Sequence, residues 1–172
     1  MTRLLVGPLG EAAQLCAAHR PSHLVSWLSP PAVPPSIDPA LAPEHRLHLS
    51  SHDVSEPTPG LTAPDLAQVE ALLAFARSWN RQRPLLVHCW AGVSRSTAAA
   101  YAIACQARPD LDEMALAKQL RRLSPTATPN PLVVRLADGL LGREDRMSAA
   151  IAAIGRGAET ALGTVFELDL GA

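Results

Sequence analysis

Residues 84–88 form a continuous apolar run, Pro-Leu-Leu-Val-His, with no polar face. A strand that is apolar on both faces suits the centre of a parallel sheet that helices cover from both sides. From about Ser94 the chain continues as an alanine-rich segment that ends near Cys105. Alanine favours a helix and allows it to pack closely on a sheet. The two segments therefore predict a buried strand, a short loop and a buried helix.

Strand and helix patterns alternate through most of the remaining chain. Residues 29–43 are the main interruption, because they hold six of the 16 prolines and predict an irregular loop. The order of elements predicts an α/β fold: a central, mainly parallel sheet of about four or five strands, with helices on both faces. The expected strands are residues 4–6, 23–28, 46–50 and 84–88, and the expected helices are residues 9–18, 63–79, 94–105, 110–123, 131–141 and 143–154.

Polar residues indicate where several of these helices begin. Thr62 and Asp65 have the spacing of a capping box, which predicts Thr62 as the N-cap of the second helix. Asp110 places an acidic side chain at the expected start of the fourth helix. Asn130 precedes a proline and predicts an N-cap, and Gly142 predicts the end of the same helix.

Composition limits the partners that the chain can have. Its 172 residues include 15 basic and 16 acidic side chains, so the formal net charge of −1 gives no general attraction for nucleic acid or an anionic membrane. Cys16, Cys89 and Cys105 are irregularly spaced, which argues against a disulfide framework and against a zinc site. No apolar run is long enough for a signal-peptide core or a membrane span. We expect one domain, residues 1–172, in the cytoplasm.

Residues 88–96, His-Cys-Trp-Ala-Gly-Val-Ser-Arg-Ser, connect the apolar strand to the alanine-rich helix. A turn of this length can direct successive backbone N–H groups inward, where they add to the positive end of the helix dipole and form an anion cradle. Gly92 removes a side chain where the turn is tightest. Arg95 offers a planar fork that can bind two phosphate oxygens. These groups favour the thiolate form of Cys89, which is a nucleophile for phosphate esters.

The pattern His88-Cys89, five residues, Arg95-Ser96 resembles the His-Cys-x5-Arg-Ser/Thr signature loop of the protein-tyrosine phosphatase superfamily. The resemblance implies that Cys89 is the nucleophile and that Arg95 binds phosphate. Ser96 would assist breakdown of a phosphocysteine intermediate, and His88 would order the loop. The implied phosphate-binding amides are those of Trp90, Ala91, Gly92, Val93, Ser94 and Arg95. We expect the Trp90 side chain to pack against the body of the protein rather than stack on a substrate.

A second segment is similar to the dual-specificity branch of this superfamily, and the chain resembles the small bacterial-type phosphatases of that kind. Pro129-Asn130 matches a Pro-Asn step before a helix, so that Asn130 has a supporting role. The resemblance extends over residues 3–141. Residues 143–172 form a carboxyl-terminal extension to which the sequence assigns no role.

The resemblance also implies an aspartate that acts as general acid on a mobile loop before the cysteine. Asp53 lies 36 positions before Cys89 in a proline-bounded loop and is the preferred candidate. Glu56 is close enough to take the same role, and Asp38 lies further away. Asp65 is explained by helix capping.

These features predict a cysteine-dependent phosphomonoester hydrolase that acts on phosphotyrosine or mixed phosphoprotein substrates. No metal or cofactor is expected, and the expected partner is a phosphorylated protein. Two alternatives stay open: a catalytically silent phosphate-binding module, and a phosphatase for a lipid, an RNA 5'-phosphate or a small metabolite. The sequence indicates no oligomeric state. Cys16 and Cys105 fall on expected helices and are predicted to be core residues.

Overall fold

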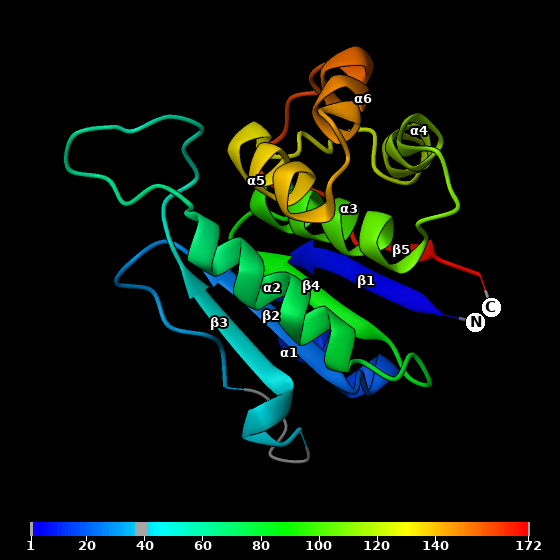
Figure 1. Ribbon diagram of the computed structural model, residues 1–172. Helices are drawn as coiled ribbons and strands as arrows, with labels where there is room; N and C mark the ends of the chain where they lie inside the picture. Colours follow the sequence, from blue (N-terminus) through cyan, green and yellow to red (C-terminus); the bar gives the residue numbers. More distant parts are fainter. Residues whose placement is uncertain (1, 37–40, 172) are drawn as a thin grey trace.

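A computed structural model describes residues 2–36 and 41–171 of the chain. Its centre is a five-stranded sheet with the strand order β3-β2-β4-β1-β5 (Figure 1). Four strands run parallel, and the last runs antiparallel at the edge beside β1. The prediction of a mainly parallel α/β sheet is confirmed. The strands are β1 (Arg3–Pro8), β2 (His23–Leu28), β3 (Arg46–Ser50), β4 (Leu85–Cys89) and β5 (Phe166–Asp169).

Helices cover both faces of the sheet, but unequally. Figure 1 shows α1 on the face opposite to α2 and α3, with the remaining helices stacked outside α3. No helix in residues 2–36 and 41–171 is long and apolar enough to cross a bilayer. The α-helices are α1 (Ala12–His19), α2 (Leu66–Ser78), α3 (Arg95–Ala107), α4 (Glu113–Leu123), α5 (Pro131–Leu141) and α6 (Arg146–Ile154), and the short 3-10 helices are η1 (Leu9–Glu11) and η2 (Pro43–His45).

The central strand β4 contributes to both layers of the core, as its apolar sequence predicts. Leu85 and Val87 belong to the large cluster beneath α2 to α6, whereas Leu86 belongs to the small cluster beneath α1. This division follows from the alternation of side chains along a strand. Helix α3 packs on β4 and β1, and its residues are buried without interruption from Arg95 to Cys105. The strand and the helix that flank the signature loop are therefore both held in the core.

Thr62 and Asp110 do not mark helix starts as expected, and α6 begins at Arg146 rather than at Arg143. Helix α2 begins at Leu66 with Asp65 as its N-cap, because Gln68 at the third position completes a capping box with Asp65; Thr62 lies in the preceding loop. Helix α4 begins after Asp112, whose side chain caps it, whereas Asp110 forms an ion pair in the preceding turn. The predicted Asn130 cap of α5 and its stop at Gly142 are both present.

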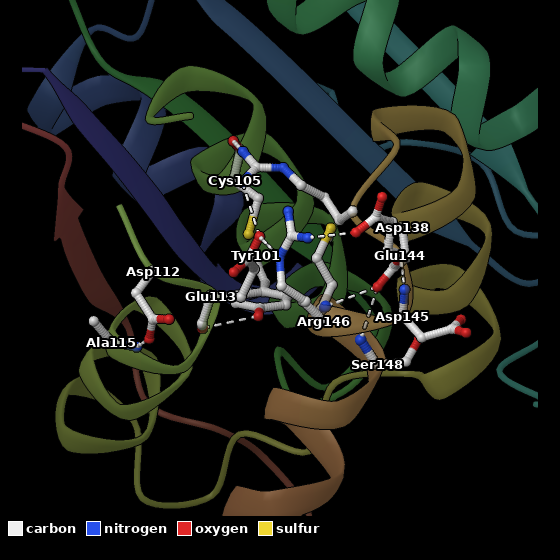
Figure 2. A network of polar contacts seen from close by, with 12 residues as sticks. Tyr101, Cys105, Asp112, Glu113, Ala115, Asp138, Glu144, Asp145, Arg146 and Ser148 are labelled. Atoms are coloured by element: carbon white, nitrogen blue, oxygen red, sulfur yellow. Dashed lines mark hydrogen bonds and ion pairs between the residues drawn. The ribbon is translucent and has the colours of Figure 1, made fainter. Parts of the chain in front are cut away.

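The carboxyl-terminal extension is part of the fold, because it supplies α6 and β5. A buried carboxylate, Glu113 of α4, holds this region to the body through ion pairs with Arg143 at 2.8 Å and Arg146 at 3.2 Å (Figure 2). Burial raises the pKa of Glu113, but hydrogen bonds from its own backbone and from the two arginines outweigh this, and the pKa is lowered overall. Glu113 therefore remains charged within the network.

A second buried carboxylate starts α6. Asp138 of α5 accepts hydrogen bonds from three backbone N–H groups at the beginning of α6, as Figure 2 shows. These are among the helix amides that have no partner within the helix itself. Since Asp145 makes no side-chain cap bond, Asp138 takes the place of an N-cap residue. The donors are the amides of Asp145, Met147 and Ser148, at 2.8, 2.7 and 3.1 Å.

His88 connects two neighbouring strands at the end nearest the signature loop. Its Nδ1 lies 3.4 Å from the Cys89 carbonyl oxygen, and its Nε2 lies 2.7 Å from Ser26 Oγ. A carbonyl oxygen can only accept, so Nδ1 carries the proton and Nε2 accepts from the Ser26 hydroxyl. Burial is the main cause that lowers the pKa of His88 to about 4, although the bond to the carbonyl opposes it. The ring is therefore neutral at pH 7.

This depressed pKa predicts a specific acid sensitivity. The unfolded chain takes up a proton at His88 near pH 6.5, whereas the folded chain stays neutral at this ring until about pH 4. Between these values the unfolded state binds more protons, so stability falls as the pH falls. Relative to His88→Asn, we expect the wild type to lose up to about 3 kcal/mol of its free energy of unfolding between pH 7 and pH 4.

Denaturant unfolding at a series of pH values measures this difference. The control is Leu72→Ala in the core, which removes no titratable group and should therefore keep the wild-type pH dependence. A His88→Asn curve parallel to the wild-type curve would contradict the assignment of a buried, neutral ring.

Candidate active site

The signature loop lies between the end of β4 at Cys89 and the start of α3 at Arg95. Gly92 has a φ of +71°, and a Cβ at this position would lie 2.7 Å from the backbone nitrogen of Pro8. Both the backbone angle and this close approach therefore require glycine. The Gly92 amide donates a hydrogen bond to Cys89 Sγ at 3.2 Å. The tight turn thus brings backbone N–H groups back toward the cysteine.

The carbonyl groups of the loop point outward into the body of the protein. Since a trans peptide unit holds its C=O and N–H in opposite directions, an outward carbonyl turns the next N–H toward the inside of the loop. The amides of Ala91 and Ser94 have no acceptor in the described part of the chain. The outward bonds are Leu9 N–H to Trp90 O (3.1 Å), Gly163 N–H to Ala91 O (2.8 Å), Thr128 N–H to Val93 O (2.9 Å) and Asn130 N–H to Ser94 O (3.3 Å).

Cys89 is buried at the base of the hollow that these amides surround. Its Sγ lies 3.1 Å from Ser96 Oγ, in addition to the bond that it accepts from Gly92. A hydroxyl can donate to sulfur, so that two donors converge on this atom. The sulfur therefore has two hydrogen-bond donors beside it at the base of the hollow.

Arg95 presents one edge of its guanidinium to the structure and leaves the other edge to the hollow. Nη1 donates to the Ser51 carbonyl at 2.6 Å and to Ser29 Oγ at 3.0 Å, at the carboxyl ends of β3 and β2. The side chain is 4% exposed, yet its Nε has no hydrogen-bond partner among the described residues, and no described carboxylate pairs with it. A buried cation of this kind is costly without an anion. The geometry fits bidentate binding of an oxyanion.

Asp53 is held beside the loop by two side chains. Its Oδ1 accepts from Ser94 Oγ at 2.7 Å and from Asn130 Nδ2 at 2.8 Å. The same Asn130 amide group donates to the Val54 carbonyl, while its Oδ1 caps helix α5. Asn130 therefore fixes the loop that carries Asp53 to the start of a buried helix.

A single cavity of about 500 Å³ brings Cys89, Arg95 and Asp53 together. Glu56 does not line this cavity, and Asp38 lies outside the described residues. Asp53 is thus the acidic candidate that reaches the hollow. The other lining residues are Trp90, Ala91, Val93 and Ser94 of the signature loop, Ser29, Pro30, Pro31 and Ala32 after β2, and Thr160 of the carboxyl-terminal extension.

The expected packing of Trp90 against the body is wrong. Its side chain is 61% exposed and lines the mouth of the cavity, whereas Trp27 and Trp79 are buried. The backbone carbonyl of Trp90, not its indole, contacts the body through Leu9. The Trp90 indole therefore lies at the rim of the cavity.

Several wall residues had no signal in the sequence analysis. Ser29 and the residues after it could have been suspected, because ligands bind at the carboxyl ends of parallel strands. Thr160 has no such signal, since it lies far along the chain in a segment without helix or strand.

The remaining cysteines, Cys16 and Cys105, are buried, and burial raises the pKa of Cys105 to about 12. Cys105 is therefore an unreactive thiol.

No protein-family model and no curated protein matches the sequence. Solved structures of phosphatases are similar to most of the chain at low sequence identity. The PTP-2 phosphatase of Cydia pomonella is 20% identical with a TM-score of 0.56, covering 78% of this chain and 83% of its own. DUSP15 is 19% identical with a TM-score of 0.55, covering 89% and 92%. PTPMT1 in complex with PI(5)P is 16% identical with a TM-score of 0.60, covering 88% and 93%. The chain therefore has the fold of the protein-tyrosine and dual-specificity phosphatases.

Proposed function

We propose that the chain is a cysteine-dependent phosphatase that hydrolyses phosphomonoesters through a phosphocysteine intermediate. The observation that carries this proposal is the Arg95 guanidinium, which is buried without a described counter-ion and lines the same hollow as Cys89. Loop amides turned toward this hollow add further donors. A dianionic phosphate group supplies the charge and the acceptors that this arrangement lacks.

In the first step the Cys89 thiolate attacks phosphorus, and a sulfur–phosphorus bond forms while the ester phosphorus–oxygen bond breaks. The loop amides and Arg95 stabilise the charge on the three equatorial oxygens. Asp53 in its protonated form gives its proton to the departing oxygen. Since Ser94 and Asn130 hold Oδ1, Oδ2 is the oxygen that carries this proton.

In the second step water attacks the phosphocysteine, and Asp53 accepts a proton from the water as it attacks. The sulfur–phosphorus bond breaks, and the electron pair returns to Cys89 as a thiolate. The Ser96 hydroxyl, 3.1 Å from Sγ, donates a hydrogen bond to this leaving thiolate. Inorganic phosphate is released, and the starting state is restored.

The walls of the cavity favour a phosphoprotein substrate with one phosphate group. Arg95 is the cationic side chain among the described lining residues, and Pro30, Pro31, Ala32 and the Trp90 indole provide apolar surface. PTPMT1 has been solved in complex with PI(5)P, so the fold can accept a phosphoinositide. A lipid headgroup with several phosphates would need more cations than this cavity offers. Phosphotyrosine, whose ring fits an apolar rim, is the substrate that we propose first.

Replacement of Cys89 by serine tests the nucleophile. Serine lacks a stabilised anion at neutral pH, so we expect kcat for an aryl phosphate to fall at least about 10⁴-fold. Binding of inorganic phosphate, measured by calorimetry, should persist because Arg95 and the amides are unchanged. Cys105→Ser is the matched control and should keep wild-type turnover. Appreciable turnover by Cys89→Ser would refute the mechanism, and a wild type that binds phosphate without turnover would indicate a silent binding module.

Replacement of Asp53 by asparagine tests the general acid. Asparagine keeps an acceptor for Ser94 and Asn130 but has no proton to transfer, so the loss should depend on the leaving group. We expect kcat to fall about 10²-fold or more on phenyl phosphate and much less on p-nitrophenyl phosphate, whose leaving group needs little protonation. Glu56→Gln is the control and should leave both rates unchanged. A large loss for Glu56→Gln with none for Asp53→Asn would reverse the assignment.

A further inference from the structure

The segment of residues 155–165, between α6 and β5, has no helix or strand of its own but is fixed to the body. Arg121 of α4 donates to the carbonyls of Ile154 and Gly155 at 2.9 and 2.7 Å. The amides of Gly157 and Ala158 bond to the turn before α5, at Thr128 Oγ1 and the Pro125 carbonyl. The strand that follows pairs with β1. This segment is therefore held at both ends.

Between these anchors the segment touches the signature loop. The buried Gly163 donates its N–H to the Ala91 carbonyl at 2.8 Å. A Cβ at Gly163 would lie 2.7 Å from the Gly92 carbonyl oxygen, so only glycine permits this approach without a shift. Three residues earlier, Thr160 lines the cavity itself. The carboxyl-terminal extension thus supports the loop from behind and reaches the rim of the site.

The contact at Gly163 acts on the sulfur through one planar unit. The Ala91 carbonyl and the Gly92 N–H belong to the same peptide, so fixing the first in one direction fixes the second in the opposite direction. That N–H is the one that donates to Cys89 Sγ at 3.2 Å. The two hydrogen bonds therefore form a chain from Gly163 through the Ala91–Gly92 peptide to the sulfur, and such chains strengthen each bond by polarisation.

We propose that Gly163 is a positioning residue for the nucleophile, and that the carboxyl-terminal extension belongs to the phosphate-binding machinery. This proposal rests on the proposed function. The proposal assigns a role to residues 155–165, which lie outside residues 3–141, the part of the sequence that resembles the phosphatases. Gly163 does not contact the substrate; it keeps the Gly92 N–H directed at Cys89 and thereby stabilises the thiolate before and after phosphoryl transfer.

The test is Gly163→Ala, whose added methyl group must push the segment away from the Gly92 carbonyl. We expect the rate of alkylation of Cys89 by iodoacetamide at pH 7, followed by mass spectrometry of its peptide, to fall about five- to tenfold. The pH profile of alkylation should move to higher pH, and kcat/KM for an aryl phosphate should fall by a similar factor. An unchanged profile in a folded variant would overturn the proposal.

Two control variants separate positioning from stability. Gly139→Ala on α5 adds a methyl group with no heavy atom within 4 Å and should leave alkylation and turnover unchanged. Leu72→Ala truncates a buried side chain on α2, whose main packing partners are β3, α3 and α5, and should lower Tm without moving the alkylation profile. A profile that moves equally in Leu72→Ala would show that Gly163→Ala acts through general loosening, and would refute the proposal.

Hydrogen exchange of the wild type gives a second measurement that holds even if Gly163→Ala does not fold. The Gly163 amide should be protected as strongly as the amides of Leu9 and Thr128, which bond to the same loop. Exchange at the rate of an exposed loop would overturn the proposal. Alkylation and exchange need no turnover, so a wild type that hydrolyses nothing would reject the proposed function alone. If the wild type turns over normally and Gly163→Ala is alkylated with the wild-type rate and pH profile, the positioning role alone is rejected.

Discussion

The orientation of the peptide units in the signature loop is the constraint on which the site depends. Four carbonyls are held outward by amides from four separate places: the end of β1, the turn before α5, the cap of α5 and the carboxyl-terminal extension. As long as they are held, the N–H groups between them converge on the hollow at Cys89 and Arg95. The rest of the fold thus fixes the direction of the backbone N–H groups in the signature loop.

The close approach of Cys89, Gly92 and Arg95 could be predicted because these residues are near one another in the sequence. The sequence itself places a cysteine, a glycine and an arginine within a few residues of one another, between an apolar strand and an alanine-rich helix. The two-sided burial of β4 follows in the same way from its side chains. Helix starts were harder to predict, because neighbouring polar residues can each act as the N-cap. In α2, Asp65 forms a capping box with Gln68, and Thr62 is therefore not the N-cap.

The contacts that position the loop could not be predicted, because each joins residues far apart in the sequence. The carbonyl of Ser51 orients the Arg95 guanidinium across the ends of two strands, and no pattern around either residue indicates it. The sequence around Gly163 does not indicate its contact with the signature loop, because this contact depends on the pairing of β5 with β1. The exposure of Trp90 had no signal either, because its backbone contact with Leu9 joins residues far apart in the sequence.

A crystal structure with vanadate tests the central claim most directly, because vanadate adopts the geometry of the phosphoryl group in transfer. Our account predicts a bond between vanadium and Cys89 Sγ, hydrogen bonds from Nε and Nη2 of Arg95 to the equatorial oxygens, and inward amides from the signature loop around them. Asp53 should lie beside the oxygen opposite the sulfur. Vanadate bound outside this hollow, or an Arg95 guanidinium turned away from the anion, would contradict the account.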